Sequence, residues 1–188
     1  DQDMHEEFRQ RLDRIHQEIV QQGQRVEAMV ERAFESVFDS DRAKAQQVVR
    51  DDDLIDRVDI EIEKAAVELL SIGERNATQL RMVLTIVKVN NELERIADLG
   101  AQVAEQVVLV SRCQEAFPPT LRVTVNSVIG MIRDANVSLR DLDSSRARQV
   151  LASDDLVEKF SRTLFREVQQ QLSQGACTLD FCSAFWTI

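Results

Sequence analysis

Residues 39–56, DSDRAKAQQVVRDDDLID, and residues 141–158, DLDSSRARQVLASDDLVE, align without a gap at an offset of 102. Eight of the 18 positions are identical, and both stretches contain an Asp-Asp-Leu run. Ungapped identity at one fixed offset indicates an internal duplication, and the repeat unit is too long to be a single solenoid repeat. The sequence therefore predicts two similar halves related by a pseudo-twofold arrangement.

Helical periodicity extends over almost the whole chain. Apolar residues recur at intervals of three and four, and sustained strand-like alternation is absent. The 188 residues include only five Gly and two Pro, so few positions interrupt a helix. The fold class is therefore predicted to be all-α. The predicted helices run approximately over residues 5–38, 42–72, 77–113, 121–139 and 144–174, and a sixth begins within residues 177–188.

Turn and capping signals set these bounds. The DSD sequence at 39–41 predicts a turn and the N-cap of the second helix. Asn76 and Gln79 resemble a capping box that opens the third helix. On the first helix, one face collects the apolar residues and is predicted to point inward: Phe8, Leu12, Ile15, Ile19, Val26, Met29 and Val30.

A linker is predicted at Pro118 and Pro119, because two consecutive prolines are incompatible with a helix interior. This linker separates two pseudo-symmetric three-helix bundles with long up-and-down helices. We predict the first bundle at residues 1–115 and the second at 119–188, with the second bundle incomplete at its C-terminal end.

The charge balance limits the classes of partner. Lys and Arg total 23 against 33 Asp and Glu, which gives a formal net charge of -10. Binding to nucleic acid or to anionic lipid needs clustered cations, so both are disfavoured. The excess of carboxylates favours metal ions, or basic patches on other proteins, as partners.

The three cysteines, Cys113, Cys177 and Cys182, fit no CxxC or Cys/His metal spacing, and a sparse odd set suits a reducing compartment. No stretch approaches the ~20 apolar residues of a membrane-spanning helix. The first residues lack the basic start and apolar core of a secretion signal. We therefore expect a cytoplasmic protein without membrane insertion.

Carboxylates follow one narrow face of the predicted second helix. At 100° per residue, Asp52, Asp56, Asp59 and Glu63 share this arc. A solvent-exposed acidic face is the commonest explanation for such a pattern on a single helix.

The predicted third helix carries a second acidic pair, Glu94 and Asp98, on one arc with Asn91. This pair continues the line of an apolar stripe, expected to face the core, that is formed by Leu80, Val83, Leu84 and Val87. Because the helix has apolar residues on nearly all sides, simple solvation explains the pair less well. Arg95 is expected to form an ion pair with a neighbouring acid or to hold these carboxylates in place.

If the two helices are neighbours, four to six carboxylates converge on one place. Their mutual repulsion would raise some pKa values, and a multivalent cation would relieve it. Oxygen ligands suit magnesium, calcium, manganese or iron, with zinc as a further candidate. His5 and His16 lie outside the ExxH spacing of a ferritin-like di-iron site. No organic cofactor is indicated, because the sequence has no Gly-rich phosphate loop.

Two stretches carry a family resemblance: ELERIADLG at 92–100 and RDDDLIDRVDIEIE at 50–63. Together with the 102-residue repeat and the long helices, they resemble the PhoU family of bacterial phosphate-signalling proteins. That family has two three-helix bundles, each with an acidic E/D-x-x-x-D motif, here Glu94 to Asp98. The second motif is missing from this sequence, so the resemblance leaves a second metal site in doubt.

The resemblance implies a cytoplasmic regulator and not an enzyme. PhoU proteins restrain phosphate uptake and the phosphate-starvation response by linking the phosphate ABC transporter, through its ATPase subunit, to a sensor histidine kinase. Metal clusters, often of iron, are held on the acidic motifs of the family. By position, the resemblance implies these metal ligands: Asp52, Asp56, Glu94, Asp98, Asp154 and Glu158. Asp59 and Glu63 are added from the stripe alone.

Two other functions stay open. A carboxylate cluster can assemble a two-metal hydrolase of phosphate compounds, although such sites usually recruit His as well. A helical adaptor of another transport system would fit the same pattern. Exposed Phe181, Phe185 and Trp186 would favour self-association, and a homo-oligomer, a dimer, is expected.

Overall fold

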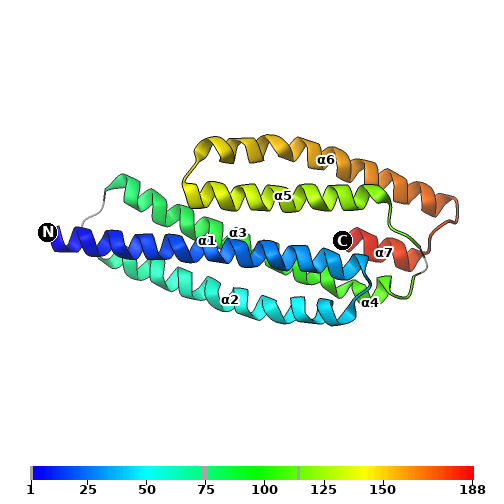
Figure 1. The fold of residues 1–188 in the computed structure, drawn as a ribbon, viewed down its shortest axis with the longest axis horizontal. Helices are drawn as coiled ribbons and strands as arrows, with labels where there is room; N and C mark the ends of the chain where they lie inside the picture. Colours follow the sequence, from blue (N-terminus) through cyan, green and yellow to red (C-terminus); the bar gives the residue numbers. More distant parts are fainter. Residues whose placement is uncertain (1, 73–75, 114) are drawn as a thin grey trace.

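The computed structural model describes residues 2–72, 76–113 and 115–188. All regular structure in these residues is helical, which confirms the all-α class. Two groups of long helices lie side by side along the length of the molecule (Figure 1). The helices are α1 Gln2–Phe38, α2 Arg42–Ser71, α3 Ala77–Glu105, α4 Val107–Val110, α5 Pro119–Asp141, α6 Ser144–Ser173 and α7 Leu179–Thr187.

Helices α1, α2 and α3 pack against one another as a three-helix bundle. All seven residues predicted to face inward on α1 are buried, among them Ile19, Val26 and Met29 at 0% exposure. At 1.5 Å per residue, the 37 residues of α1 span about 55 Å. The predicted inward face of the first helix is therefore confirmed. Helix α1 runs along the length of an elongated bundle and packs against both α2 and α3.

The core-facing stripe of α3 differs from the predicted one. Leu80 and Leu84 are 40% and 48% exposed, whereas the buried positions of α3 run through Val83, Ile86 and Asn90 toward its C-terminal end. The apolar residues of α3 surround the helix, so periodicity alone does not single out one face. The prediction that Leu80 and Leu84 belong to the core was wrong.

Small residues on α3 allow the helices to approach closely. Ala97, Gly100, Ala101 and Ala104 are buried along one side of this helix. A Cβ atom added at Gly100 would lie 3.4 Å from a methyl group of Val30 on α1, so this part of α3 packs in van der Waals range of α1. These small residues let the α3 backbone approach α1 next to the part of α3 that carries Glu94 and Asp98.

The predicted third helix is interrupted before Cys113. Helix α3 ends at Glu105, and the short α4 follows after Gln106. Around Gln106 the backbone hydrogen bonds span three residues instead of four. The N–H of Gln106 donates to the carbonyl of Val103, and the N–H of Leu109 donates to the carbonyl of Gln106. Such bonding is typical of 3₁₀ turns at helix ends.

The duplication is repeated in the helix boundaries. Helix α2 covers 42–71 and α6 covers 144–173, an offset of 102 at both ends. Asp41 and Asp143 are the two N-caps, and each is preceded by a residue of positive φ, Ser40 at 52° and Leu142 at 53°. Helix α7 begins 102 residues after α3 but is only nine residues long. The predicted pseudo-symmetry is confirmed.

The other predicted helix starts agree with the structure to within three residues, and α1 begins at Gln2 instead of at about residue 5. Asn76 and Gln79 form the predicted capping box. Helix α5 begins at Pro119, two residues earlier than predicted, with Pro118 as its N-cap residue. Proline is well suited to the first turn of a helix, because the missing N–H has no partner there.

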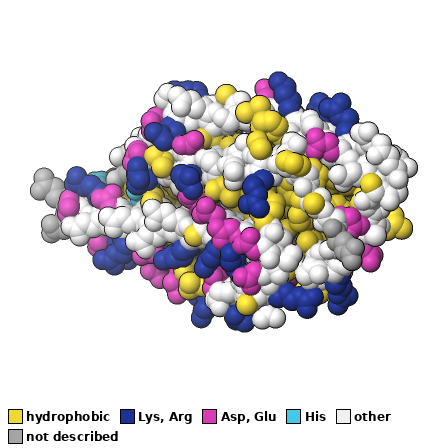
Figure 2. Space-filling view, turned by 45° about the vertical axis from the view of Figure 1, so that its right-hand side comes forward, with side chains coloured by type: hydrophobic (Ala, Val, Ile, Leu, Met, Phe, Trp, Pro, Cys, Tyr) yellow, Lys and Arg dark blue, Asp and Glu magenta, His cyan; other side chains and the backbone are white. Residues whose placement is uncertain are grey.

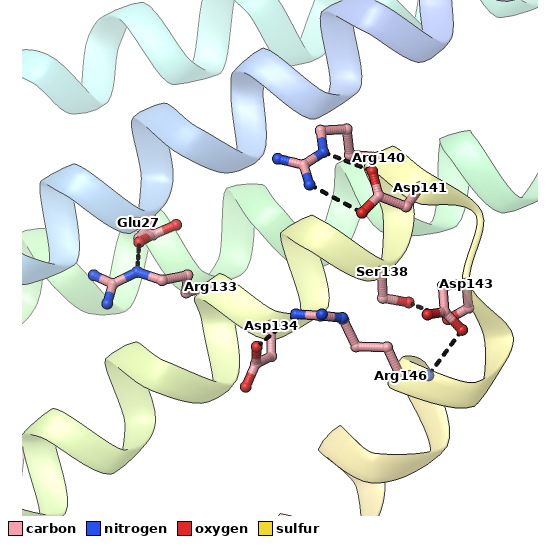
Figure 3. A network of polar contacts seen from close by, with 8 residues as sticks. All are labelled: Glu27, Arg133, Asp134, Ser138, Arg140, Asp141, Asp143 and Arg146. Carbon is pink, nitrogen blue, oxygen red and sulfur yellow. Dashed lines mark hydrogen bonds and ion pairs between the residues drawn. The ribbon is translucent and has the colours of Figure 1, made fainter.

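Helix α5 joins the two halves by packing against α1. The Asn136 amide donates to the Gly23 carbonyl at 2.8 Å, and a Cβ atom at Gly23 would lie 2.3 Å from the Asn136 side chain. Arg133 pairs with Glu27 of α1 at 2.7 Å, whereas the neighbouring bonds in Figure 3 lie within α5, α6 and their connection. The division at 115 and 119 remains a prediction, but the buried apolar residues of both halves form one contiguous core.

Aromatic side chains pack where α7 meets the linker. Phe117 contacts the rings of Phe38, Phe181 and Phe185, with centroids 5.3 to 6.5 Å apart. Phe181 and Phe185 are buried, whereas Trp186 is 48% exposed, so only part of the expected aromatic patch is on the surface. Figure 2 views the molecule with the right-hand side of Figure 1 turned toward the reader, and hydrophobic side chains gather on this face.

Candidate metal centre

Three of the predicted ligands come together between α2 and α3. Asp52 and Asp56 lie one turn apart on α2, and Asp98 faces them from α3. One carboxylate oxygen from each residue lies within 4.8 Å of the others. The tertiary structure thus brings together two acidic motifs that are more than 40 positions apart in the sequence.

The pairs meet because each has a spacing of four residues. On a helix, side chains at i and i+4 lie on one face. Buried Ile55 lies on the adjoining side of α2 from the two acids, and buried Ala97 precedes Asp98 on α3. Burial of these apolar neighbours therefore fixes the rotation of each helix and directs the carboxylates toward the seam.

Asp52 is the most perturbed carboxyl group of the cluster. Partial burial, followed by the charges of Asp56 and Asp98, raises its pKa to about 6. Its Oδ1 atom is buried and has no hydrogen-bond partner among the described residues. An unpaired buried carboxylate oxygen is costly, so this atom is well placed to bind a cation.

Asp59 and Glu94 extend the cluster along the seam. Burial is the largest cause that raises the pKa of both carboxyl groups. The next cause is the negative charge of Glu63 for Asp59 and that of Asp98 for Glu94. The pKa of Glu94 is also raised by Asp59 and Asp56. Six acidic residues therefore interact within one region, and each of them had been singled out from the sequence: Asp52, Asp56, Asp59, Glu63, Glu94 and Asp98.

Asn90 was missed by the sequence reasoning, which had placed Asn91 in the cluster. Asn91 is exposed, whereas Asn90 is fully buried and its amide donates 2.5 Å to the Asp59 carboxylate and 3.0 Å to the Asp59 carbonyl. The Asn90 Oδ1 atom is buried and lacks a partner among the described residues. A polar residue in the buried series Val83, Ile86, Leu93 was the signal that could have identified it.

Arg95 serves the simpler of its two predicted roles. Its guanidinium pairs with Glu92 at 3.0 Å on the exposed side of α3. This bond links neighbouring turns of one helix, and the charge of Arg95 also acts on the neighbouring Glu94, whose pKa it lowers against the larger effects of burial and of the nearby acids.

Asp154 and Glu158 do not join the cluster. Both are exposed on α6, which lies on the opposite side of the molecule from α2 (Figure 1). Glu158 instead pairs with Arg162 at 2.5 Å, one turn along the same helix. They are the repeat equivalents of Asp52 and Asp56, but no acidic helix faces them within the described residues.

The donor set at the α2–α3 seam fits a hard cation. The three converging ligands are all carboxylates, which suit magnesium, calcium, manganese or iron. The orphaned Asp52 oxygen and the raised pKa of Asp52 both indicate excess negative charge at this place. A bound cation would remove the repulsion among Asp52, Asp56 and Asp98.

Comparison with known proteins gives a consistent result. The PhoU domain matches residues 10–107, more than half of the chain. The phosphate-specific transport system accessory protein PhoU homolog of Aquifex aeolicus is 25% identical over 159 residues, covering 84% of this chain and 72% of its own length. The Pseudomonas aeruginosa homolog is 28% identical over 167 residues, which cover 87% of this chain and 68% of the homolog.

Solved structures agree in fold. The crystal structure of PhoU from Pseudomonas aeruginosa superposes with a TM-score of 0.88 at 25% identity, covering 96% of this chain and 88% of the other. The crystal structure of PhoU from Streptococcus pneumoniae superposes with a TM-score of 0.89 at 20% identity, covering 96% of this chain and 86% of the other. No helix in the described part of the chain is both long and apolar enough to cross a membrane. On the extent of the domain match, the chain belongs to the PhoU family.

Proposed function

We propose that this chain is an accessory protein of phosphate transport that restrains phosphate uptake and the phosphate-starvation response. In this proposal it acts in the cytoplasm as an adaptor, without catalysis of its own. The observation that carries the proposal is the convergence of Asp52, Asp56 and Asp98 in a member of the PhoU family. The names of the relatives support the link to phosphate transport.

A metal ion is the proposed ligand of the acidic cluster. Asp52, Asp56, Glu94 and Asp98 would hold it, and Asp59 would stay bound to the Asn90 amide. The ion would neutralise the cluster and fix α2 against α3. It would supply structure and a charged surface, and no reaction step is assigned to it.

The proposed partners are the ATPase subunit of a phosphate ABC transporter and a sensor histidine kinase, and the proposed assembly is a dimer. The net charge of -10 favours basic partner surfaces. Asp56 in the cluster and Asp53 beside it are exposed on α2 and are suited to such a surface.

The test is a pull-down of the purified ATPase subunit and the kinase by the metal-loaded chain. We expect retention of both partners by the wild type and reduced retention by Asp56→Asn. Glu158→Gln removes the same charge from the equivalent position of α6 and serves as the matched control. Loss of binding in both variants to the same extent, or no retention by the wild type, would contradict the proposal.

The hydrolase alternative is tested on the same preparations. Phosphomonoester turnover is measured with added manganese, magnesium or iron. We expect no turnover above the metal blank. Turnover by the wild type that disappears in Asp98→Ala would replace the adaptor proposal by an enzymatic one.

A further inference from the structure

The start of α7 carries two cysteines at positions that helix capping brings together. Thr178 is the N-cap, and its hydroxyl accepts the backbone N–H of Phe181 at 3.2 Å. Cys177 precedes the cap, and Cys182 is the fourth residue of the helix. Side chains at these two positions commonly pack together as a hydrophobic staple. Here both members of the staple are thiols.

The two sulfur atoms lie 3.4 Å apart. A disulfide needs about 2.05 Å, so the sulfur atoms would have to approach by about 1.4 Å, a movement within the reach of side-chain rotation. Cys182 is 2% exposed, whereas Cys177 is half-buried and lines a surface cavity together with Cys113 and Glu115. An oxidant can therefore reach Cys177 and not Cys182.

We propose that Cys177 and Cys182 form a reversible disulfide that staples the first turn of α7 when the chain meets a peroxide. The Cys177 sulfur attacks one peroxide oxygen, the O–O bond breaks, and a sulfenic acid and one water result. The Cys182 sulfur then displaces the sulfenic oxygen, which leaves as a second water. The two thiols lose two electrons and two protons, and the peroxide gains them. This inference is independent of the proposed function.

The surroundings determine the rate of this step. Burial, followed by the hydrogen bond with Cys182, raises the pKa of Cys177 to about 11, and the charge of Glu115 acts in the same direction. Burial also raises the pKa of Cys113. Because the thiolate is the reacting form, both groups react slowly at neutral pH. The proximity of Cys182, and not an activated thiolate, is what selects Cys177.

The location of the pair suggests what the bridge would control. Phe181, between the two cysteines, and Phe185 pack against Phe117 of the linker. A bridge between Cys177 and Cys182 would hold these rings in the contact that joins α7 to the rest of the molecule. In the first half the sequence has Arg75 and Leu80 at the equivalent positions, so only the second half can be cross-linked in this way.

Peptide mapping of the whole chain tests the proposal. The protein is treated with hydrogen peroxide at mildly alkaline pH, remaining thiols are alkylated, and trypsin is added. Trypsin places Cys177 and Cys182 on one peptide, 167–188, and Cys113 on another, 113–122. We expect 167–188 to lose two hydrogens and to escape alkylation, while 113–122 is alkylated. Treatment with a dithiol reductant should reverse the change.

Matched variants make the result decisive. Cys113→Ser should form the bridge as the wild type does, and Cys182→Ser should leave Cys177 as a sulfenic or sulfinic acid. Amide exchange of residues 179–187 should slow on oxidation of the wild type and of Cys113→Ser but not of Cys182→Ser, with unchanged circular dichroism. A cross-link between peptides 113–122 and 167–188, equal alkylation of all three cysteines, or unchanged exchange after oxidation would overturn the proposal.

Discussion

The two halves of this protein share their helix boundaries but differ in what their third helix does. In the first half, the 29 residues of α3 pack against both α1 and α2. In the second half, the nine residues of α7 contact mainly α4 and one end of α6. Val48 on α2 is 0% exposed, whereas its repeat equivalent on α6, Val150, is half-buried. A third helix of full length thus decides how deeply the second helix is buried.

The same difference decides whether carboxylates become a site. Asp52 and Asp56 face Asp98 across the seam, while Asp154 and Glu158 lie exposed on α6. The acidic repeat is present in both halves, but among the described residues it is α3 alone that brings further carboxylates to it. A pattern on one helix is therefore a candidate ligand set, and the partner helix supplies the further carboxylate that makes it a candidate metal site.

The largest expected effect compares identical residues in the two halves. Val48→Ala removes two buried methyl groups and should lower the free energy of unfolding by about 2 kcal/mol or more. Val150→Ala makes the same change at a half-buried position and should cost about 1 kcal/mol or less. Urea unfolding of both variants measures this difference. Equal losses would mean that the two halves are equally well packed.

A second comparison concerns the affinity for metal. Asp98→Asn keeps the side-chain volume but removes one of the three converging charges, so it should weaken metal binding about tenfold or more. Glu158→Gln should leave the affinity unchanged, because Glu158 pairs with Arg162 away from the cluster. Elemental analysis after mild chelation and reloading, with titration of manganese, gives the two affinities. If Asp98→Asn binds as much metal as the wild type, the cluster is an ordinary exposed acidic face.

The smallest of these effects depends on pH. The pKa of Asp52 is raised from 3.8 to about 6 in the folded chain, so the folded state holds a proton that the unfolded state has lost in this range. The stability of the metal-free protein should therefore fall as the pH rises from about 4 to about 6, by about 1 kcal/mol after solvent screening. Asp52→Asn cannot ionise and should lack this part of the decline.

Unfolding in the presence of a chelator, at several pH values, compares the two proteins. The stability difference between Asp52→Asn and the wild type should grow with pH across that window. Saturating metal should remove the difference in slope, because the ion stabilises the ionised carboxylate. A difference that stays constant with pH would show that Asp52 ionises normally in the folded chain.

Much of the helical framework follows from local signals. Asp41, Asp143 and the Asn76–Gln79 box act as helix starts wherever the chain lies, because a capping side chain bonds to backbone only two or three residues away. The inward face of α1 was predictable because its polar and apolar residues separate cleanly. The face of α3 was not, because apolar residues surround it and burial of Leu80 or Val83 looks equivalent in the sequence.

By itself, the sequence determined the duplication, most helix starts and the acidic residues available as ligands. The tertiary structure decided which of these acids meet and that Asn90, not Asn91, supports them. The physical reason is that a ligand set spanning two helices depends on their relative rotation and axial shift. Those are fixed by packing, here by the small residues of α3 against α1, and no local interaction along the chain specifies them.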